Sequence, residues 1–377
     1  MQRSWRNTLA LVGLLSLALS TAACSSGGTT GGTSGTGSTS DVSSPSEAGG
    51  DKTSQSAAKP DGDLAKITVS MLTDDTAMPV WLAQKLGYFE DNGLDVTFQY
   101  SANGAAALPA GVAGDWQAGW IGAPPALTGW DKWGLISFPH IKEQRNLKLI
   151  MRNDALDGKT PAEVLKTGKI GTGANSTYEN LLFECAKHFG VDPGDLQIVP
   201  LDPPQVRQAL ASGQIQAGTT SASGDFDFVN DKDKYTMVCD GDTAGANFIT
   251  MYMVTPKFFD AHPDQAAEYV DAVYRANEYV NENPGKATDY MVEFGKEVGL
   301  DINKQKAEYT LKARDWVTLD QAISDAKDGT TQKTLEQLVD FFVQVGVYTD
   351  KPDVAALEAV SLKVLNAAKD YRDKQGR

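Results

Sequence analysis

Apolar and polar positions follow two rhythms along the chain after about residue 63. Short apolar runs with the composition of buried strands are separated by stretches in which apolar residues recur at helical spacing. Strands are predicted at 66–72, 94–100, 118–121, 148–151, near 170, 196–200, 215–218, 235–239 and 248–254. Helices are predicted at 79–93, 105–113, 176–189 and 205–212. This alternation predicts an α/β fold with parallel sheets.

The alternating pattern restarts at Lys169, which indicates two lobes with a sheet each. After about residue 247 the sequence is mostly helical, with clear apolar periodicity over 266–280 and 335–347. This helical C-terminal region must pack on one of the two lobes.

The first 62 residues follow a different pattern. Arg3 and Arg6 precede an apolar run, and small residues then lead to Cys24, an order typical of a signal peptide over residues 1–23. Residues 25–62 are almost entirely Ser, Gly, Thr, Ala and Asp, so we expect a flexible tether without a core. The Leu-Ser-Thr-Ala-Ala-Cys stretch ending at Cys24 resembles a bacterial lipobox, which implies a lipid anchor on Cys24 at a membrane surface. An ordinary signal peptide with a chance cysteine is the alternative.

Composition narrows the class of protein. A hydrophobic content of 41% supports a packed core, and a net charge of −15 argues against nucleic-acid binding. Three cysteines and three histidines are too few for a disulfide scaffold or a multi-histidine metal cage, and we expect no metal and no cofactor. Cys185 and Cys239 would form a disulfide outside the cell if they lie close together, which the sequence leaves open.

Ligands of open parallel sheets bind beyond the carboxyl ends of the strands. Five loops occupy such places, at 73–76, 101–104, 122–124, 172–177 and 219–223, and several are rich in hydroxyl, amide and glycine residues. We expect ligand contacts from Asp74, Asp75, Asn103, Gly122, Ala123, Asn175, Ser176, Thr177, Thr219, Ser221 and Tyr252. A planar ligand would stack on Tyr178, Tyr252 or one of the tryptophans at 81, 116, 120, 130 and 133, although most of these are expected to be packing residues.

Asp74 and Asp75 bear most directly on the ligand. One interpretation leaves one carboxylate in solvent and the other as a helix cap. The functional interpretation has one carboxylate accepting from an N–H group of the ligand. The five loops contain no Lys or Arg, and only Arg145 or Arg152 is expected near the hinge. We therefore expect a nitrogen-bearing ligand, zwitterionic or neutral heteroaromatic, rather than a simple inorganic anion.

Ser176 opens a predicted helix, with Glu179 three residues later, which predicts a capping box. The preceding glycines partly resemble a dinucleotide-binding loop, with Ser176 in place of the third glycine. Exposed amides at this helix end would also suit an anionic ligand group, so capping and ligand contact remain compatible.

The segment from Met78 to Val96, with its Gly-Tyr-Phe and Gly-Leu-Asp-Val stretches, resembles the periplasmic-binding-protein family of nitrate, sulfonate, taurine and thiamin-precursor ABC importers. The similarity continues over 114–134 and from Lys169 to Gly213. Gln117 and Gln216 depart from it, because the family places Asp there to order a turn, and Gln is expected to substitute only in part.

The resemblance implies a type II binding fold with two hinge crossings, near Asn153 and Thr243–Gly245. Lobe 1 would comprise 63–152 and 244–377, and lobe 2 would comprise 153–243. It also implies a monomer outside the cytoplasm that delivers a small molecule to a membrane permease by hinge closure.

Two other functions remain as alternatives. A yeast-type thiamin-pyrimidine synthase shares this fold, but its cysteine-rich run and active-site histidine are absent from this sequence, and we expect no catalytic residues. A sensor role would use the same cleft to signal to a membrane receptor.

Overall fold

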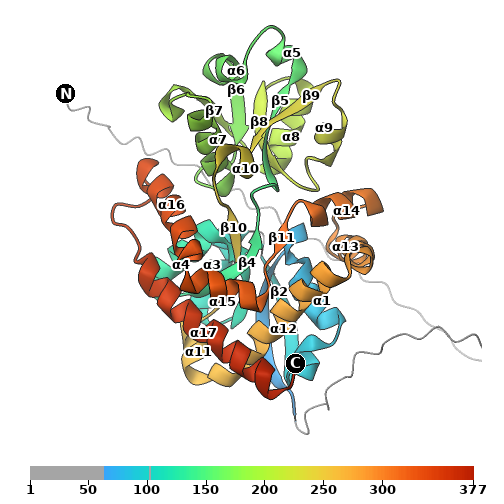
Figure 1. Cartoon of the computed structure of the whole chain (residues 1–377), viewed down its shortest axis with the longest axis vertical. Helices are drawn as coiled ribbons and strands as arrows, with labels where there is room; N and C mark the ends of the chain where they lie inside the picture. Colours follow the sequence, from blue (N-terminus) through green and yellow to red (C-terminus); the bar gives the residue numbers. More distant parts are fainter. Residues whose placement is uncertain (1–62, 102) are drawn as a thin grey trace, which may run out of the picture. The chain divides into compact units, whose positions relative to one another are not determined.

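Residues 63–101 and 103–377 are described by the computed structural model, and all of them belong to one compact unit (Figure 1). The predicted signal peptide, Cys24 and the tether lie outside the described residues. Two β-sheets organise the unit. The first has the strand order β11 (Asp315–Trp316), β4 (Ile136–Lys142), β10 (Ile249–Val254), β3 (Ala118–Gly122), β1 (Ala65–Leu72), β2 (Leu94–Ser101). The second has the order β7 (Gln197–Pro200), β6 (Lys169–Thr172), β8 (Ala217–Ser221), β5 (Leu147–Arg152), β9 (Tyr235–Asp240).

Helices accompany each sheet. The first sheet carries α1 (Met78–Lys85), α2 (Tyr88–Asp91), α3 (Gly104–Ala113), α4 (Ala123–Trp133), α11 (Pro256–Ala261), α12 (Pro263–Glu282), α13 (Pro284–Val298), α14 (Lys304–Lys312), α15 (Leu319–Lys327), α16 (Thr330–Gln344) and α17 (Val354–Lys374). The second carries α5 (Asn153–Leu156), α6 (Pro161–Thr167), α7 (Thr177–His188), α8 (Pro203–Ser212), α9 (Phe226–Asn230) and α10 (Gly241–Ala244). Short 3₁₀ turns occur at η1 (Asp75–Ala77) and η2 (Pro193–Asp195).

Both sheets are mixed, so the expectation of parallel sheets is wrong in part. In the first sheet β10 runs antiparallel to β3 and β4, and in the second β5 runs antiparallel to β8 and β9. β5 and β10 are the strands that follow each passage of the chain between the sheets. Each therefore enters its sheet from the opposite end to its neighbours.

The first passage between the sheets lies earlier than expected. β5 pairs with β8 and β9, so residues 147–152 belong to the second sheet, and the passage is 143–146 instead of near Asn153. No glycine or proline marks the turn at 143–146, whereas Asn153 and Asp154 carry an obvious turn signal. The second passage is 245–248, between α10 and β10. We call residues 63–142 and 249–377 lobe 1, and residues 147–244 lobe 2.

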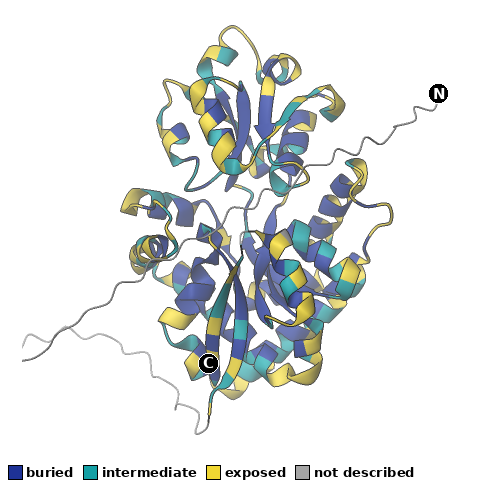
Figure 2. Cartoon of the chain, turned by 180° about the vertical axis from the view of Figure 1, so that it is seen from behind, coloured by how far each residue is buried: buried dark blue, intermediate teal, exposed yellow. Residues whose placement is uncertain are grey.

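Burial follows from where each strand sits in its sheet. β10 lies inside the first sheet, and all six of its residues are buried, whereas the edge strand β2 alternates buried and exposed positions in its first half (Figure 2). Helices α1, α12, α13 and α17 contribute to the apolar core of lobe 1. A second core continues from α4 and α16 into the sheet of lobe 2, so apolar packing spans the passages.

Two glutamines order the strand starts of both lobes. Gln117 Oε1 accepts from the Thr68 N–H at 2.8 Å, and Gln216 Oε1 accepts from the Lys169 N–H at 2.8 Å. In each lobe the backbone N–H of the same glutamine donates to the same neighbour, Thr68 or Lys169. Each glutamine therefore bonds the start of its neighbouring strand through both its side chain and its backbone.

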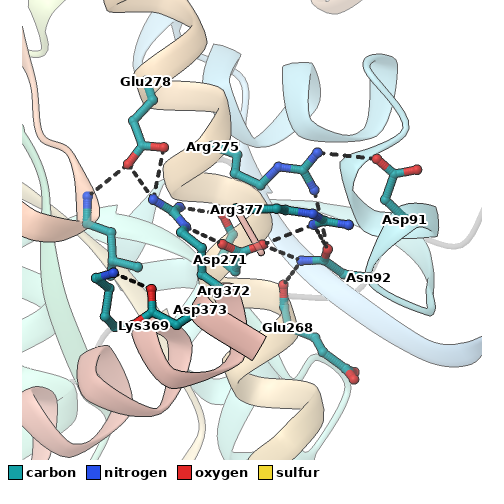
Figure 3. Close-up of polar contacts among 11 residues, drawn as sticks. Asp91, Asn92, Glu268, Asp271, Arg275, Glu278, Lys369, Arg372, Asp373 and Arg377 are labelled. Carbon is teal, nitrogen blue, oxygen red and sulfur yellow. Dashed lines mark hydrogen bonds and ion pairs between the residues drawn. The ribbon is translucent and has the colours of Figure 1, made fainter. Parts of the chain in front are cut away.

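A buried ionic network fixes the C-terminal helix to lobe 1 (Figure 3). Asp271 on α12 is fully buried and accepts from Arg372 Nε at 2.6 Å and from Asn92 Nδ2 at 2.9 Å. Arg372 also donates to Glu278 at 2.8 Å, and Arg377 lies 3.6 Å from Asp271. A buried carboxylate requires such partners, so this network is a structural anchor for α17.

No helix among the described residues combines the length and apolar composition needed to cross a bilayer. The expected helix over 79–93 is divided into α1 and α2. Gly87 between them has φ +76°, a left-handed conformation that ends α1.

Candidate functional site

A cleft of about 1440 Å³ is lined by residues of both lobes and of the first passage. Eight of the eleven expected ligand residues line it: Asp74, Asp75, Asn103, Gly122, Asn175, Ser176, Thr177 and Ser221. The carboxyl ends of β1, β3 and β8 thus meet at one cavity, as the position of the loops predicts.

Three expected residues do not line the cleft. Tyr252 is fully buried in lobe 1, where its hydroxyl donates to Asn277 at 2.9 Å and its ring lies 4.0 Å from that of His140. Thr219 is buried and donates to Thr172 Oγ1 at 2.7 Å, and Ala123 begins α4 with its side chain buried. Alternating side chains of a strand point to opposite faces, so adjacent residues of one motif reach different surroundings.

An ion pair between Asp75 and Arg314 lies in the part of the cleft that is lined by lobe 1 and the first passage, which we call the floor. Arg314 Nη2 donates to Asp75 Oδ1 at 2.7 Å, and both side chains are almost completely buried. Arg314 comes from the segment between α14 and β11, 239 residues away in sequence. Sequence reasoning missed it because an isolated arginine in a helical region carries no pattern.

Two further carboxylates surround this pair. Glu143 Oε1 lies 3.5 Å from Arg314 Nε and accepts from Asn146 Nδ2 at 3.0 Å. Asp74 accepts from the N–H of Thr76 at 2.9 Å, as the cap of the η1 turn, and also lines the cleft. We call Asp74, Asp75, Glu143 and Arg314 the floor cluster. This cluster contains three carboxylates and one guanidinium.

Burial changes the acidity of two of these carboxyl groups. It raises the pKa of Glu143 to about 7, against the lowering effect of Arg314. Burial, together with the neighbouring Asp75, raises the pKa of Asp74 to about 6. A raised pKa means that the negative charge is not fully compensated by Arg314 and the hydrogen bonds around it.

Several buried polar atoms of cleft-lining residues have no hydrogen-bond partner among the described residues. They are Asp75 Oδ2, Trp120 Nε1, Thr250 Oγ1, and Nε and Nη1 of Arg314. Buried polar groups in proteins are nearly always paired, so unpaired ones at a cavity floor are a mark of a binding site. Trp120 is the tryptophan that lines the cleft among the five considered from sequence.

Lobe 2 forms the facing wall with hydroxyl groups. Tyr178 and Ser221 share a hydrogen bond of 2.8 Å, and burial raises the pKa of the Tyr178 phenol, so it stays neutral. The expected capping box at Ser176 is not formed. The Ser176 hydroxyl donates to the carbonyl of Gly173 at 2.6 Å, and Glu179 accepts from the N–H of Asn175, one residue earlier than expected. Asn175 adopts φ +51°, which shifts the register of the cap.

Basic residues do line the cleft, contrary to the expectation from the five loops. Arg314, Arg207 on α8 and Lys306 on α14 all contribute to its wall. Arg145 lies in the first passage, as expected, and Arg152 ends β5. They pair with Asp315 and Asp154, and neither lines the cleft. The absence of basic residues from the loops was therefore a poor guide to the charge of the site.

The passages connect the floor cluster to lobe 2. Asn146 Oδ1 accepts from the N–H of Ala222 at 2.9 Å, and the Glu143 N–H donates to the carbonyl of Phe248 at 2.7 Å in the second passage. Farther from the cleft, Cys185 on α7 and Cys239 on β9 form a disulfide, with Cα atoms 6.0 Å apart. The disulfide ties together two elements of lobe 2.

Comparison with known proteins places this geometry in a family. The model of the family described as NMT1/THI5 like matches residues 75–287, which is more than half of the chain. The chain belongs to the NMT1/THI5-like family. The match includes Asp75, Glu143 and the whole of lobe 2, while Arg314 lies beyond it.

Relatives of this family member carry the names of binding proteins. A Brucella abortus (strain 2308) relative with a provisional name as a binding protein is 22% identical over 289 residues, covering 70% of this chain and 81% of its own. The taurine-binding periplasmic protein of Escherichia coli K12 is 23% identical over 228 residues, covering 58% of this chain and 68% of its own.

Solved structures show the same fold. The periplasmic aliphatic sulphonate-binding protein SsuA of Escherichia coli has a TM-score of 0.62 at 14% identity, over 77% of this chain and 90% of that protein. The periplasmic nitrate-binding protein NrtA of Synechocystis PCC 6803 has a TM-score of 0.64 at 11% identity, over 82% and 89%. The NMT1/THI5-like chain therefore has the periplasmic-binding-protein fold that its sequence predicts.

Proposed function

We propose that this protein is the extracytoplasmic solute-binding component of an ABC importer. It captures a small molecule between its lobes and delivers it to a membrane permease. Its family, its relatives named for taurine and other binding functions, and a cleft lined from both lobes support this role. Its function is binding and not catalysis, in keeping with relatives that are named as binding proteins.

The proposal includes anchoring by Cys24 to the outer face of the membrane, with residues 25–62 as a tether. The order of charged, apolar and small residues before Cys24 supports it. Expression in a bacterium fed with labelled palmitate tests it. Label on the wild-type protein and none on Cys24→Ala is the expected result, and an unlabelled wild type would contradict anchoring.

The charge of the floor cluster carries the proposal about the ligand. Asp75 alone balances Arg314, so Asp74 and Glu143 add negative charge to the floor. A ligand with an amine or another N–H donor gains from these carboxylates, while a bare anion is repelled. The excess negative charge of the floor cluster, and not an absence of basic residues, therefore supports a ligand with an amine or another N–H donor. Taurine-like amines and aminopyrimidines fit this description, and nitrate does not.

Hinge closure would use the two passages. The bonds from Asn146 to Ala222 and from Glu143 to Phe248 join the floor cluster to both passages, so a ligand at the floor contacts the region about which the lobes move. Tyr178 and Ser221 of lobe 2 would then close on the ligand from the facing wall.

A thermal-shift screen tests the proposed function, because a ligand that binds only the folded state raises the melting temperature. The panel comprises ethylamine, taurine, 4-amino-5-hydroxymethyl-2-methylpyrimidine, ethanesulfonate and nitrate. We expect at least one of the compounds with an amine or another N–H donor to raise the melting temperature, and nitrate to leave it unchanged. Stabilisation by nitrate or ethanesulfonate alone would contradict the ligand class, and conversion of a compound into a product would contradict the binding role.

A further inference from the structure

Arg314 has the properties of an oxyanion-binding residue. Its side chain is buried at the floor of the cleft, and its Nη1 atom has no hydrogen-bond partner among the described residues. A guanidinium is a preferred partner of carboxylates, sulfonates and other oxyanions because it donates two parallel hydrogen bonds. The floor cluster nevertheless surrounds this group with three carboxylates.

We infer that Glu143 and Asp74 determine the charge class of the ligand: they exclude from Arg314 those oxyanions that carry no cationic nitrogen, and the same cleft without these two charges binds such oxyanions. This inference rests on the proposed function of ligand capture in this cleft. It assigns specificity to two residues that act by repulsion.

The roles of the three carboxylates differ by their geometry. Asp75 contacts Arg314 at 2.7 Å and balances its charge. Glu143 lies 3.5 Å from Arg314 Nε, and Asp74 accepts a hydrogen bond from Thr76. Their two negative charges exceed the single positive charge that Asp75 already balances. In a buried site of low dielectric, each excess charge acts strongly on an incoming anion. Removing Glu143 and Asp74 leaves a neutral Asp75–Arg314 pair.

The floor also offers neutral donors for an oxyanion. Trp120 Nε1 on β3 and Thr250 Oγ1 on β10 are buried and have no partner among the described residues. These strands are neighbours, with Thr250 opposite Gly122 and Tyr252 opposite Trp120. The donors required by an oxyanion are thus already present, and the two excess carboxylates are what oppose its binding.

The test is calorimetric binding of ethanesulfonate at pH 8 to the wild type, Glu143→Gln, Asp74→Asn and the double variant. Asp95→Asn is the control, because it removes a negative charge from an exposed residue at the start of β2, which does not line the cleft. We expect the double variant to bind ethanesulfonate at least about tenfold more tightly than the wild type, and the control to change by less than about twofold. Equal affinity of wild type and double variant would overturn the inference.

A second measurement covers the case in which the double variant does not fold. Lowering the pH from 8 to 5.5 protonates Glu143 and Asp74, so the wild type should bind ethanesulfonate more tightly at pH 5.5. The other titratable or charged groups around Glu143 and Asp74 are Asp75, His140, Tyr178, Asp225 and Arg314. Unchanged affinity would overturn the inference. If the wild type binds no nitrogen-bearing compound, the proposed ligand class fails, while the gain of ethanesulfonate binding still tests the role of Glu143 and Asp74.

Discussion

His140 Nε2 lies 2.9 Å from the carbonyl oxygen of Thr76, the residue that follows Asp74 and Asp75. The backbone carbonyl of the same histidine accepts from the N–H of Val317 at 3.2 Å, three residues after Arg314. One residue of β4 therefore supports the loop and the segment that carry the two partners of the central ion pair. His140 therefore connects the two distant parts of the chain that form the ion pair.

Replacing His140 tests this support. His140→Phe removes the donor to Thr76 and should weaken ligand binding and lower stability by about 1–3 kcal/mol, because a buried carbonyl loses its partner. His140→Gln retains an N–H donor and should recover part of both losses. Urea unfolding together with calorimetry measures both quantities. If Phe and Gln reduce ligand affinity equally, the hydrogen bond to Thr76 has no role in positioning the loop.

His140 should contribute to the pH dependence of the free energy of unfolding. Burial lowers the pKa of His140 to about 3, far below 6.5 in an unfolded chain. Below pH 6.5 the unfolded chain takes up a proton that the folded chain does not, so this residue makes the folded state less stable as the pH falls. Urea unfolding at pH 7 and pH 5 should show a smaller loss of stability for His140→Gln than for the wild type. An identical loss would mean that His140 is protonated in the folded protein.

Glu143 should have the opposite effect from His140 on stability, because it favours the folded state at low pH. Its pKa is raised to about 7, so between pH 4.5 and pH 7 the folded state binds the proton more tightly than the unfolded state. This contribution to stability is present at low pH and is lost as the pH rises through 7. Glu143→Gln should therefore be more stable than the wild type at pH 8, by about 1–3 kcal/mol, with little difference near pH 5. A variant less stable than the wild type at pH 8 would show that the charge is well compensated.

The Cys185–Cys239 disulfide should stabilise lobe 2 without taking part in ligand binding. It closes a loop with a sequence separation of 54, for which the loss of unfolded-state entropy predicts about 4 kcal/mol. The Cys185→Ala/Cys239→Ala variant should melt at a lower temperature, while its ligand affinity changes little at a temperature where it is folded. A melting temperature equal to that of the oxidised wild type would contradict this role.

The ionic network around Asp271 should affect the stability of the fold but not ligand binding. Arg372→Met leaves Asp271 buried with less compensation, and removing one partner of a buried pair costs about 3–5 kcal/mol. We expect a large loss in urea unfolding and unchanged ligand affinity in the folded fraction, since neither residue lines the cleft. Altered affinity would mean that α17 and the floor cluster are coupled.

The sequence predicted most of the fold and the loops of the site, because these depend on local patterns. Apolar runs identified β1, β2, β3 and β10 to within about two residues, and strand ends identified Asp74, Asp75 and Ser221 at the cleft. β4 was missed because Pro139 and His140 interrupt its apolar residues. β5 was assigned to the wrong lobe because the passage between β4 and β5 carries no glycine or proline. Arg314 and Glu143 were missed because their importance arises from contacts between distant segments. The five loops alone therefore do not predict the charge of the site, because Arg207, Lys306 and Arg314 come from other segments.

The most direct test of the central claim compares three compounds that share a two-carbon skeleton. Isothermal titration calorimetry at pH 8 gives the affinities of the wild-type protein for ethylamine, taurine and ethanesulfonate. With the floor cluster carrying three carboxylates against one guanidinium, the two compounds that contain nitrogen should bind at least about tenfold more tightly than ethanesulfonate. Tightest binding of ethanesulfonate would contradict the account.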